Sequence, residues 1–335
     1  MVVLSFIHHP MPGDRLLQRV LASIAIALSI VSGGAAAQSY PSKPIRLIAP
    51  FSPGGALDLI ARAIGQKLSD STGRPVIVDN RAGASGAIGS ELVAKAAPDG
   101  YTLLLGATTT HGINPALNPR LAYDPVKDFT PISLVATIPH VLVVHPSLPV
   151  KSVADLVKLA KSKPGMAYGS AGHGSPHHLA IEMLKAMAQV DLVHVAYKGS
   201  APAMIDLMSG QIQLMSVELT AAAPYIKEAR MRPIAIATPR RVAGTDLPTV
   251  IEAGYPGFEV TAWYAVFGPA GMPPAIVSKL HAEIVKAVAE PDVRERFRSL
   301  GATPVGSTPA ELASHTRAEL ARWTRVIKAA NIAPE

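Results

Sequence analysis

The sequence predicts an α/β fold in the form of a clamshell, with two lobes that face each other across a cleft. Short apolar runs alternate with segments of helical periodicity along most of the chain, which is typical of strand–helix units. Two long apolar runs, 132–145 and 258–267, are interpreted as crossovers between the lobes. Because strand–helix units lie between them, the segments before and after should share one lobe. We therefore place lobe 1 at 38–138 and 268–335, lobe 2 at 139–267, and a ligand site in the cleft.

The composition limits the classes of protein to which the chain can belong. The chain has 335 residues, enough for two lobes that each have a core, and it contains no cysteine, which excludes disulfides and thiolate metal sites. Its formal net charge is +7, but the Lys and Arg residues are scattered along the predicted helices without a clustered run. This distribution favours solvated surface charge over nucleic-acid binding.

The N-terminal segment predicts export. Arg15 and Arg19 precede an uncharged apolar run at 20–32, and small residues with an A-x-A pattern follow it. This order is typical of a secretory signal peptide, and the run is short for a membrane span. We expect 1–37 to be the signal peptide, with cleavage after Ala37 and a mature chain in the periplasm. No cysteine stands at the cleavage point, so a lipoprotein anchor is not expected.

The stretch 45–68 predicts a site for an anion. An apolar strand at 45–50 ends in the glycine-rich loop 51–55, and a helix with apolar residues at helical spacing begins at Ala56. The first N–H groups of a helix have no partner within it and carry the positive end of its dipole, which suits an anion. Asp58, in the first turn, either stabilises the dipole or faces the cleft as an acceptor for the ligand. The candidate ligand-binding residues here are Phe51, Ser52, Gly54, Gly55 and Asp58.

Two further strands end in loops of small and polar residues. The strand 76–79 leads into the loop 80–86 and a helix at 87–97, and the strand 101–106 leads into the polar stretch 107–115. The glycines of the first loop are spaced G-x-x-G-x-x-G, which differs from the dinucleotide-binding pattern. Ligands of open α/β sheets bind outside the carboxyl ends of the strands. The candidate residues of these two loops are Gly83, Ala84, Ser85, Thr109, Thr110 and His111.

Lobe 2 repeats the pattern. A strand at 166–169 precedes the small-residue loop 170–176 and a helix at 177–188, with Ser175 as the expected N-cap and Pro176 as the first helical residue. The candidate ligand-binding residues of this lobe are Ser170, Gly172, His173, Ser175 and Lys198. Other helices are expected at 150–162 with Ser152 as cap, 201–208, 273–289, 291–300 and 309–330 with a capping box of Thr308 and Glu311, and strands at 193–197, 212–217 and 233–237.

Residues that could carry other chemistry are better explained by structure. His178 and Glu182 are four apart on one helix face, but no third metal ligand is evident, so no metal is predicted. Ser175 lies in a motif that resembles a hydrolase elbow only loosely, because a proline takes the place of the last glycine. We therefore predict no catalytic residue and no cofactor. Trp263 and Tyr264, in the return crossover, are expected to pack in the core or hinge.

Five segments of the chain, in order, resemble the signature blocks of one family. They are PFSPGGALDLIAR, NRAGASGAIG, YDPVKDFTPI, VHVAYKGSAPAMIDLMSGQI and PTVIEAGYPGFEVTAWY. From residue 40 to its end the chain resembles the Bug family, the extracytoplasmic solute receptors of tripartite tricarboxylate transporters. The resemblance implies a type II periplasmic-binding-protein clamshell, with a mixed sheet flanked by helices in each lobe and two crossover strands as the hinge. It also implies that loops 51–55 and 83–86 hold a carboxylate, partly through water, and that 170–175 and the start of 198–199 face it from lobe 2.

One position departs from the family pattern. Val217 stands where the family commonly has an Asp, and Glu218 follows it, so Glu218 joins the candidate ligand-binding residues. An amino-acid ligand, whose ammonium group needs a carboxylate, becomes a less direct match.

The function expected from the sequence is capture without chemistry. A small carboxylate (a di- or tricarboxylate, an acidic amino acid or an aromatic acid) would bind a monomeric receptor, which would deliver it to the permease subunits of a tripartite tricarboxylate transporter. Two alternatives stay open: a periplasmic receptor that feeds a sensor kinase, and a periplasmic serine hydrolase that uses Ser175 with His173 or His177.

Overall fold

The computed structural model describes residues 40–197, 199–242, 245–330 and 332. The chain divides into two compact units, Met1–Ser42 and Lys43–Glu335, and every helix and strand named below belongs to the second unit. The signal peptide at 1–37, with its cleavage after Ala37, and Lys198 lie outside the described residues. Our expectations for them stay predictions.

Three short parallel strands bring the first two loops and the polar stretch to one edge. β1 (Ile45–Ala49) pairs with β2 (Val76–Asn80) on one side and with β3 (Thr102–Ala107) on the other. The strand residues Ile45 and Ile48 are completely buried, as expected for a strand that lies inside the sheet. Because the strands are parallel, the segments that follow them leave the sheet at the same edge.

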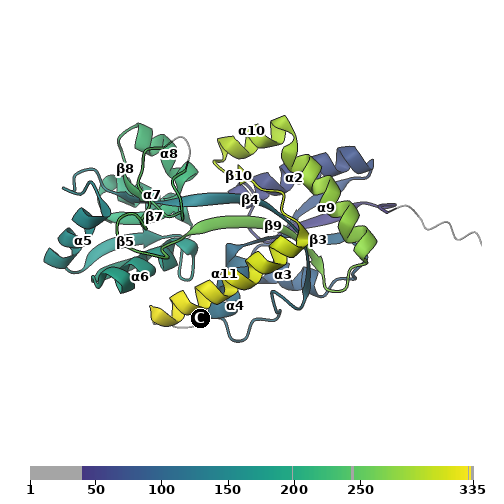
Figure 1. Ribbon diagram of the computed structural model, residues 1–335, viewed down its shortest axis with the longest axis horizontal. Coiled ribbons are helices and arrows are strands. Elements are labelled where there is room, and N and C mark those ends of the chain that lie inside the picture. The colour runs from purple at the N-terminus through teal and green to yellow at the C-terminus, as the bar shows by residue number, and fades with distance from the viewer. Residues whose placement is uncertain (1–39, 198, 243–244, 331, 333–335) are drawn as a thin grey trace, which may run out of the picture. The chain divides into compact units, whose positions relative to one another are not determined.

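Two long strands connect this group to a second group of strands (Figure 1). β4 (Phe129–Val144) pairs antiparallel with β9 (Thr261–Pro269) as far as Pro139. From His140 onwards it pairs with β7 (Leu214–Glu218), and from Val141 with β8 (Arg232–Ile236). The two crossovers expected from the sequence are therefore confirmed as part of the α/β clamshell fold, while the lobe boundaries stay a prediction.

The second group continues the sheet. β5 (Met166–Ser170) lies parallel to β7 and to β6 (Leu192–Ala196). Among the described residues the sheet has ten strands, in the order β2-β1-β3-β9-β4-β7-β5-β6, with β8 and the short β10 (Thr303–Pro304) also paired with β4.

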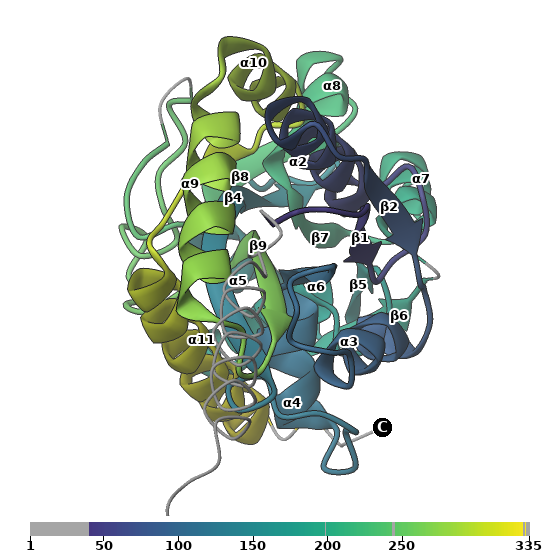
Figure 2. The same ribbon diagram turned by 90° about the vertical axis from the view of Figure 1, so that its right-hand side faces the viewer.

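Helices follow most of the strands. They are α2 (Ala56–Thr72), η1 (Ala84–Gly86), α3 (Ala87–Ala94), η2 (Thr109–Ile113), α4 (Asn114–Leu117), α5 (Val153–Ser162), α6 (Pro176–Ala188), α7 (Ser200–Ser209), α8 (Leu219–Lys227), α9 (Pro274–Ala289), α10 (Pro291–Ser299) and α11 (Pro309–Ala329). α2, α9 and α10 contact one another. α2 lies against the strands of the first group, and α9 lies against β4 (Figure 2). Within the described residues, no helix combines the length and the apolar character needed to cross a membrane.

The three predicted helix caps are confirmed. The side chain of Ser152 accepts the N–H of Asp155, and that of Ser175 accepts the N–H of His178. Thr308 and Glu311 form the reciprocal capping box at the start of α11. Each bond satisfies an N–H group that the helix itself leaves without a partner.

The polar stretch 107–115 is helical, which corrects the expectation of a loop. A π-helical turn, η2, runs directly into α4. The stretch is held by Thr110, which is fully buried and whose hydroxyl lies 2.9 Å from the N atom of Ala107 and 3.0 Å from its carbonyl oxygen. The sequence also did not predict α8 and β10.

The last helix packs against elements from both groups of strands. α11 contacts η2, α4, β4 and α6. Its buried residues Trp323 and Ile327 belong to the same apolar cluster as Leu179 and Leu184 of α6. α11 therefore joins the C-terminal segment to the strand–helix units of the second group.

Candidate functional site

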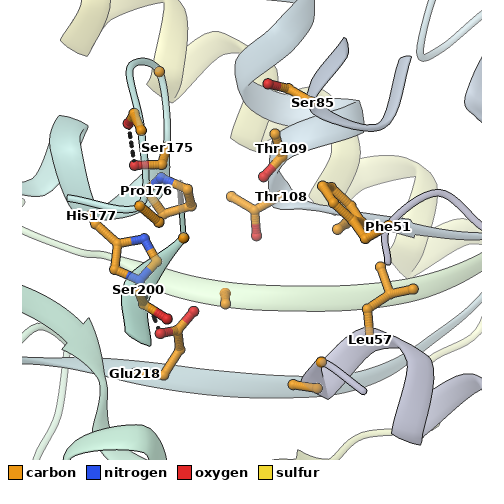
Figure 3. Close-up of a pocket in the computed structure, with 18 of the residues that line it drawn as sticks. Phe51, Leu57, Ser85, Thr108, Thr109, Ser175, Pro176, His177, Ser200 and Glu218 are labelled. Carbon is orange, nitrogen blue, oxygen red and sulfur yellow. Dashed lines mark hydrogen bonds and ion pairs between the residues drawn. The ribbon is translucent and has the colours of Figure 1, made fainter. Parts of the chain in front are cut away.

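A cavity of about 700 Å³ opens at the ends of several strands (Figure 3). Figure 3 shows Phe51 and Leu57 on one side, His177 and Glu218 on the opposite side, and Thr108 and Thr109 between them. The lining residues are Phe51, Ser52, Pro53, Gly55, Ala56, Leu57, Ser85, Ala107, Thr108, Thr109, Ala171, Gly172, His173, Gly174, Ser175, Pro176, His177, Gly199, Ser200, Glu218, Ala262, Trp263 and Tyr264.

The N-terminus of α2 forms part of the first wall. Gly55 is its N-cap residue, and no described side chain caps this helix end. The first backbone bond of the helix runs from the N–H of Leu59 to the carbonyl oxygen of Gly55, so the preceding N–H groups point out of the helix. Ala56 and Leu57, which carry two of these groups, line the cavity. An anion placed here would meet N–H donors and the positive end of the helix dipole.

Asp58 supports this wall from behind and does not line the cavity. Its carboxylate accepts hydrogen bonds from Gly54 N, Asn80 Nδ2 and Arg62 Nε, all at 3.0 Å, and its side chain is buried. Asn80 Nδ2 also donates to the carbonyl oxygen of Phe51 at 3.0 Å. Burial tends to raise the pKa of Asp58, but the hydrogen bonds from Arg62, Gly54 and Asn80 outweigh it and hold the pKa below its usual value. Asp58 therefore acts on the loop, which corrects the interpretation that it faces the cleft.

The second glycine-rich loop contributes one residue to the lining, Ser85, which has a positive φ of 52°. Its carbonyl oxygen accepts the side-chain N–H of Asn114 at 2.9 Å. The predicted residues Gly83 and Ala84, like Gly54 in the first loop, are not among the residues that line the cavity. They shape the turns, since Gly83 and Gly54 also have positive φ angles.

The polar stretch after β3 divides between the cavity and the core. Thr109 lines the cavity together with Thr108, whereas Thr110 and His111 are fully buried. The His111 ring stacks on Phe267 with 4.0 Å between ring centroids. Burial lowers the pKa of His111 to about 3, so this side chain is neutral. The prediction of Thr110 and His111 as ligand-binding residues is therefore corrected, because the π-helical turn directs them inward.

The loop after β5 forms the second wall. Gly172, His173 and Ser175 line the cavity, while Ser170 does not. The Ser170 hydroxyl lies 2.6 Å from His194 Nε2 and accepts the N–H of Gly172 at 3.1 Å. It therefore holds the loop in place from the strand end.

The hydroxyl of Ser175 is engaged by the backbone on both sides. It donates to the carbonyl oxygen of Gly172 at 2.7 Å and accepts the N–H of His178 at 3.3 Å. This is the arrangement of a helix cap, and it does not resemble a serine activated by a base. The N-terminus of α6 is thus capped, unlike that of α2. Gly199 and Ser200 at the start of α7 also line the cavity, and no described side chain caps that helix.

Glu218, at the end of β7, lies beside two histidines, His177 and His140. His177 Nε2 lies 3.0 Å from Glu218 Oε2, and His140 Nε2 lies 3.9 Å from Oε1. Burial raises the pKa of Glu218, but the neighbouring His177 and His140 outweigh this effect and hold it below its usual range. Burial lowers the pKa of His140 to about 4. Glu218 is therefore ionised and faces the cavity.

Several lining residues were not among the predicted ligand-binding residues. Two of them could have been predicted from their neighbours in the sequence. His177 is the second residue of α6, close to the candidate Ser175, and Thr108 lies in the same polar run as the candidate Thr109. Trp263 and Tyr264 were assigned to packing, and they are indeed buried, yet they also line the cavity. Ser200 follows the predicted Lys198 by two positions.

Two clusters among the described residues hold groups that could ligate a metal. Their ligand atoms lie within 4.8 Å of one another: His173, His178 and His194 in the first, and His140, His177 and Glu218 in the second. In the first cluster His178 and His194 stack nearly parallel, with centroids 4.0 Å apart and 17° between the planes. Their ring nitrogens therefore do not converge on one point. The second cluster is already joined by the hydrogen bond between His177 and Glu218.

Comparisons with known proteins agree with this architecture. A family model described as "Tripartite tricarboxylate transporter family receptor" matches residues 60–332. Protein BugT of Bordetella pertussis is 36% identical over 92% of this chain and 97% of its own length. The structure of R. palustris Rpa4515 with adipate has a TM-score of 0.79 and 39% identity, covering 88% of this chain and all of that one. MatC (Rpa3494) from Rhodopseudomonas palustris with bound malate has a TM-score of 0.75 and 35% identity, covering 86% of this chain and all of that one.

These matches span most of the chain and share its fold, and they confirm the resemblance found in the sequence. The chain belongs to the family of tripartite tricarboxylate transporter receptors, the periplasmic solute receptors that include the Bug proteins.

Proposed function

We propose that this receptor captures a small carboxylate on the N-terminus of α2 and delivers it to the membrane subunits of a tripartite tricarboxylate transporter. The observation that carries the proposal is the uncapped start of α2 on the wall of the cavity, where Ala56 and Leu57 line it. The adipate and malate named with the two related structures support a carboxylate as the ligand.

The proposed mechanism is binding followed by closure, without chemistry. The carboxylate binds the wall made by Phe51, Ser52, Gly55 and the α2 N-terminus, and the wall of 171–177 closes over it. The lobes that move are those proposed from the sequence, 38–138 with 268–335 against 139–267. A ligand that binds the closed form more tightly shifts the population towards it. The closed form then docks on the permease, after export and cleavage of 1–37.

The test removes a single N–H group from the wall. Ala56→Pro deletes the N–H at the first helical position, where proline is well tolerated, and Gly55 before it already has the extended backbone that proline requires. Losing a hydrogen bond to a charged group should weaken carboxylate binding by about tenfold or more. Ala56→Gly, which keeps the N–H, is the matched control and should bind nearly as the unchanged protein does.

The measurement is calorimetry and thermal shift on the exported protein with a panel of acids that includes adipate and malate. Equal affinity in Ala56→Pro and Ala56→Gly would place the carboxylate elsewhere. Turnover of an ester panel that Ser175→Ala abolishes would favour the hydrolase. Uptake of the bound acid by vesicles that carry the permease separates transport from signalling to a kinase.

A further inference from the structure

We propose that Glu218 selects a ligand with an ammonium group at the end opposite its carboxylate, so that the preferred solutes are small amino acids whose charges lie far apart. The inference rests on the proposed function, since it takes the carboxylate to bind at α2. It concerns the opposite wall of the cavity, where Figure 3 shows Glu218 and His177 across from Phe51 and Leu57.

The Glu218 carboxylate has free positions for accepting further hydrogen bonds. Its Oε2 is 3.0 Å from His177 Nε2, which is a hydrogen bond, but its Oε1 is 3.9 Å from His140 Nε2, which is too long for one. An ionised carboxylate offers about four acceptor positions. The side chain lines the cavity and keeps 20% of its surface exposed, so a donor on a ligand can reach it.

The charged side chains around the cavity also favour an ammonium group at Glu218. The described lining residues include one acidic residue, Glu218, and neither lysine nor arginine. Tyr264, also on the wall, is a neutral phenol whose pKa is raised by burial and by Glu218. A second carboxylate placed at Glu218 would face a like charge, whereas an ammonium group there would be attracted by it.

The N-terminus of α7 also lies on this side of the cavity, through Ser200. A helix N-terminus carries the equivalent of roughly half a positive charge, and Glu218 carries a full negative charge. The helix end therefore offsets only part of the field of Glu218.

A metal ion is the competing occupant, because His140, His177 and Glu218 could also ligate one. Glu218 is acceptor-only when ionised, so the bond at 3.0 Å requires His177 Nε2 to carry its proton. A metal would have to displace that proton and the hydrogen bond. An ammonium group can add to Glu218 while leaving this hydrogen bond intact.

The experiment compares ligands of equal length that differ only at the far end. The pairs are 4-aminobutanoate with succinate, 5-aminopentanoate with glutarate and 6-aminohexanoate with adipate, measured by calorimetry on the exported protein in EDTA. At one length or more, the amino acid should bind at least about tenfold more tightly than the diacid, as expected for a partly buried charge pair. Glu218→Gln should reverse this order. Glu228→Gln, an exposed acid-to-amide change outside the cavity, is the control and should keep it.

The outcomes separate this inference from the function on which it rests. Tighter binding of the diacid at every length overturns the inference and leaves carboxylate capture standing. A preference for the amino acid that Glu218→Gln does not change also overturns it, because another group would then be responsible. In a separate thermal-shift experiment without EDTA, stabilisation by Zn²⁺ alone that is lost in Glu218→Gln would assign the wall to a metal and overturn the inference. If no acid of either kind binds, the proposed function itself fails.

Discussion

Trp263 donates its indole N–H to Glu319, with 2.9 Å between Nε1 and Oε2. The same oxygen accepts the indole N–H of Trp323 at 3.1 Å, and Arg322 pairs with the carboxylate as well. Trp263 lines the cavity and Glu319 belongs to α11, so this buried group connects the wall of the site to the last helix.

Glu319→Ala should destabilise the protein strongly. The change leaves two buried indole N–H groups without an acceptor and removes the carboxylate that pairs with Arg322, which keeps its hydrogen bond to the carbonyl oxygen of Glu259. Removing one partner of a buried ion pair typically lowers the free energy of unfolding by about 3–5 kcal/mol. Urea unfolding followed by tryptophan fluorescence measures it. Glu319→Gln keeps one acceptor oxygen and should lose less. A loss below about 1 kcal/mol in Glu319→Ala would show that water replaces the carboxylate.

Asp58→Ala should weaken ligand binding although Asp58 does not line the cavity. The change removes the acceptor of Gly54 N and of Asn80 Nδ2, which hold the first loop in its position. We expect a loss of affinity of about tenfold and a loss of stability of about 1.5–3 kcal/mol, the usual range for hydrogen bonds to a charged group. Calorimetry and urea unfolding measure the two. Arg62→Ala, which leaves the bonds from Gly54 and Asn80 intact, should have a smaller effect on affinity.

Gly86→Ala should disturb the cavity through Phe51. Gly86 has a φ of +86°, and a Cβ there would lie 2.8 Å from Thr110 Cγ2 and 3.0 Å from Phe51 Cζ. Backbone strain and the clash together should lower the free energy of unfolding by about 2–4 kcal/mol and displace Phe51. Gly73→Ala is the matched control, because Gly73 also has a positive φ, +66°, but open space around its Cβ. If both variants lose the same stability and both keep ligand affinity, Phe51 does not depend on Gly86.

The stability of the protein should fall as the pH falls below about 6.5, and His111 should contribute to this. Burial lowers the pKa of His111 from 6.5 to about 3, so the unfolded chain binds more protons between these values. The free energy of unfolding then decreases by about 1.4 kcal/mol per pH unit for each such histidine. Urea unfolding at pH 7.5, 6, 5 and 4.5 measures the slope. His111→Phe keeps the stacking on Phe267 and should flatten the slope by about this amount, and an unchanged slope would contradict the assignment.

Much of the fold followed from the sequence because it depends on neighbouring residues. The glycine-rich loop before α2, the caps at Ser152 and Ser175 and the capping box at Thr308 are short-range arrangements, and their residue types predict them directly. The two long strands were also recognisable from their apolar length. The sequence by itself therefore determined the order of most elements and the presence of small-residue loops at the ends of several strands.

Only the tertiary structure decided which side chains face the cavity. Asp58 turns to the loop behind it, and His111 turns to Phe267, because packing in three dimensions selects the direction of each side chain. Glu218 meets His177 across 41 positions of sequence, and this requires α6, β7 and the register that pairs His140 with Glu218. Local propensity holds no information about such contacts, since they form only when distant elements are brought together by burial of the core.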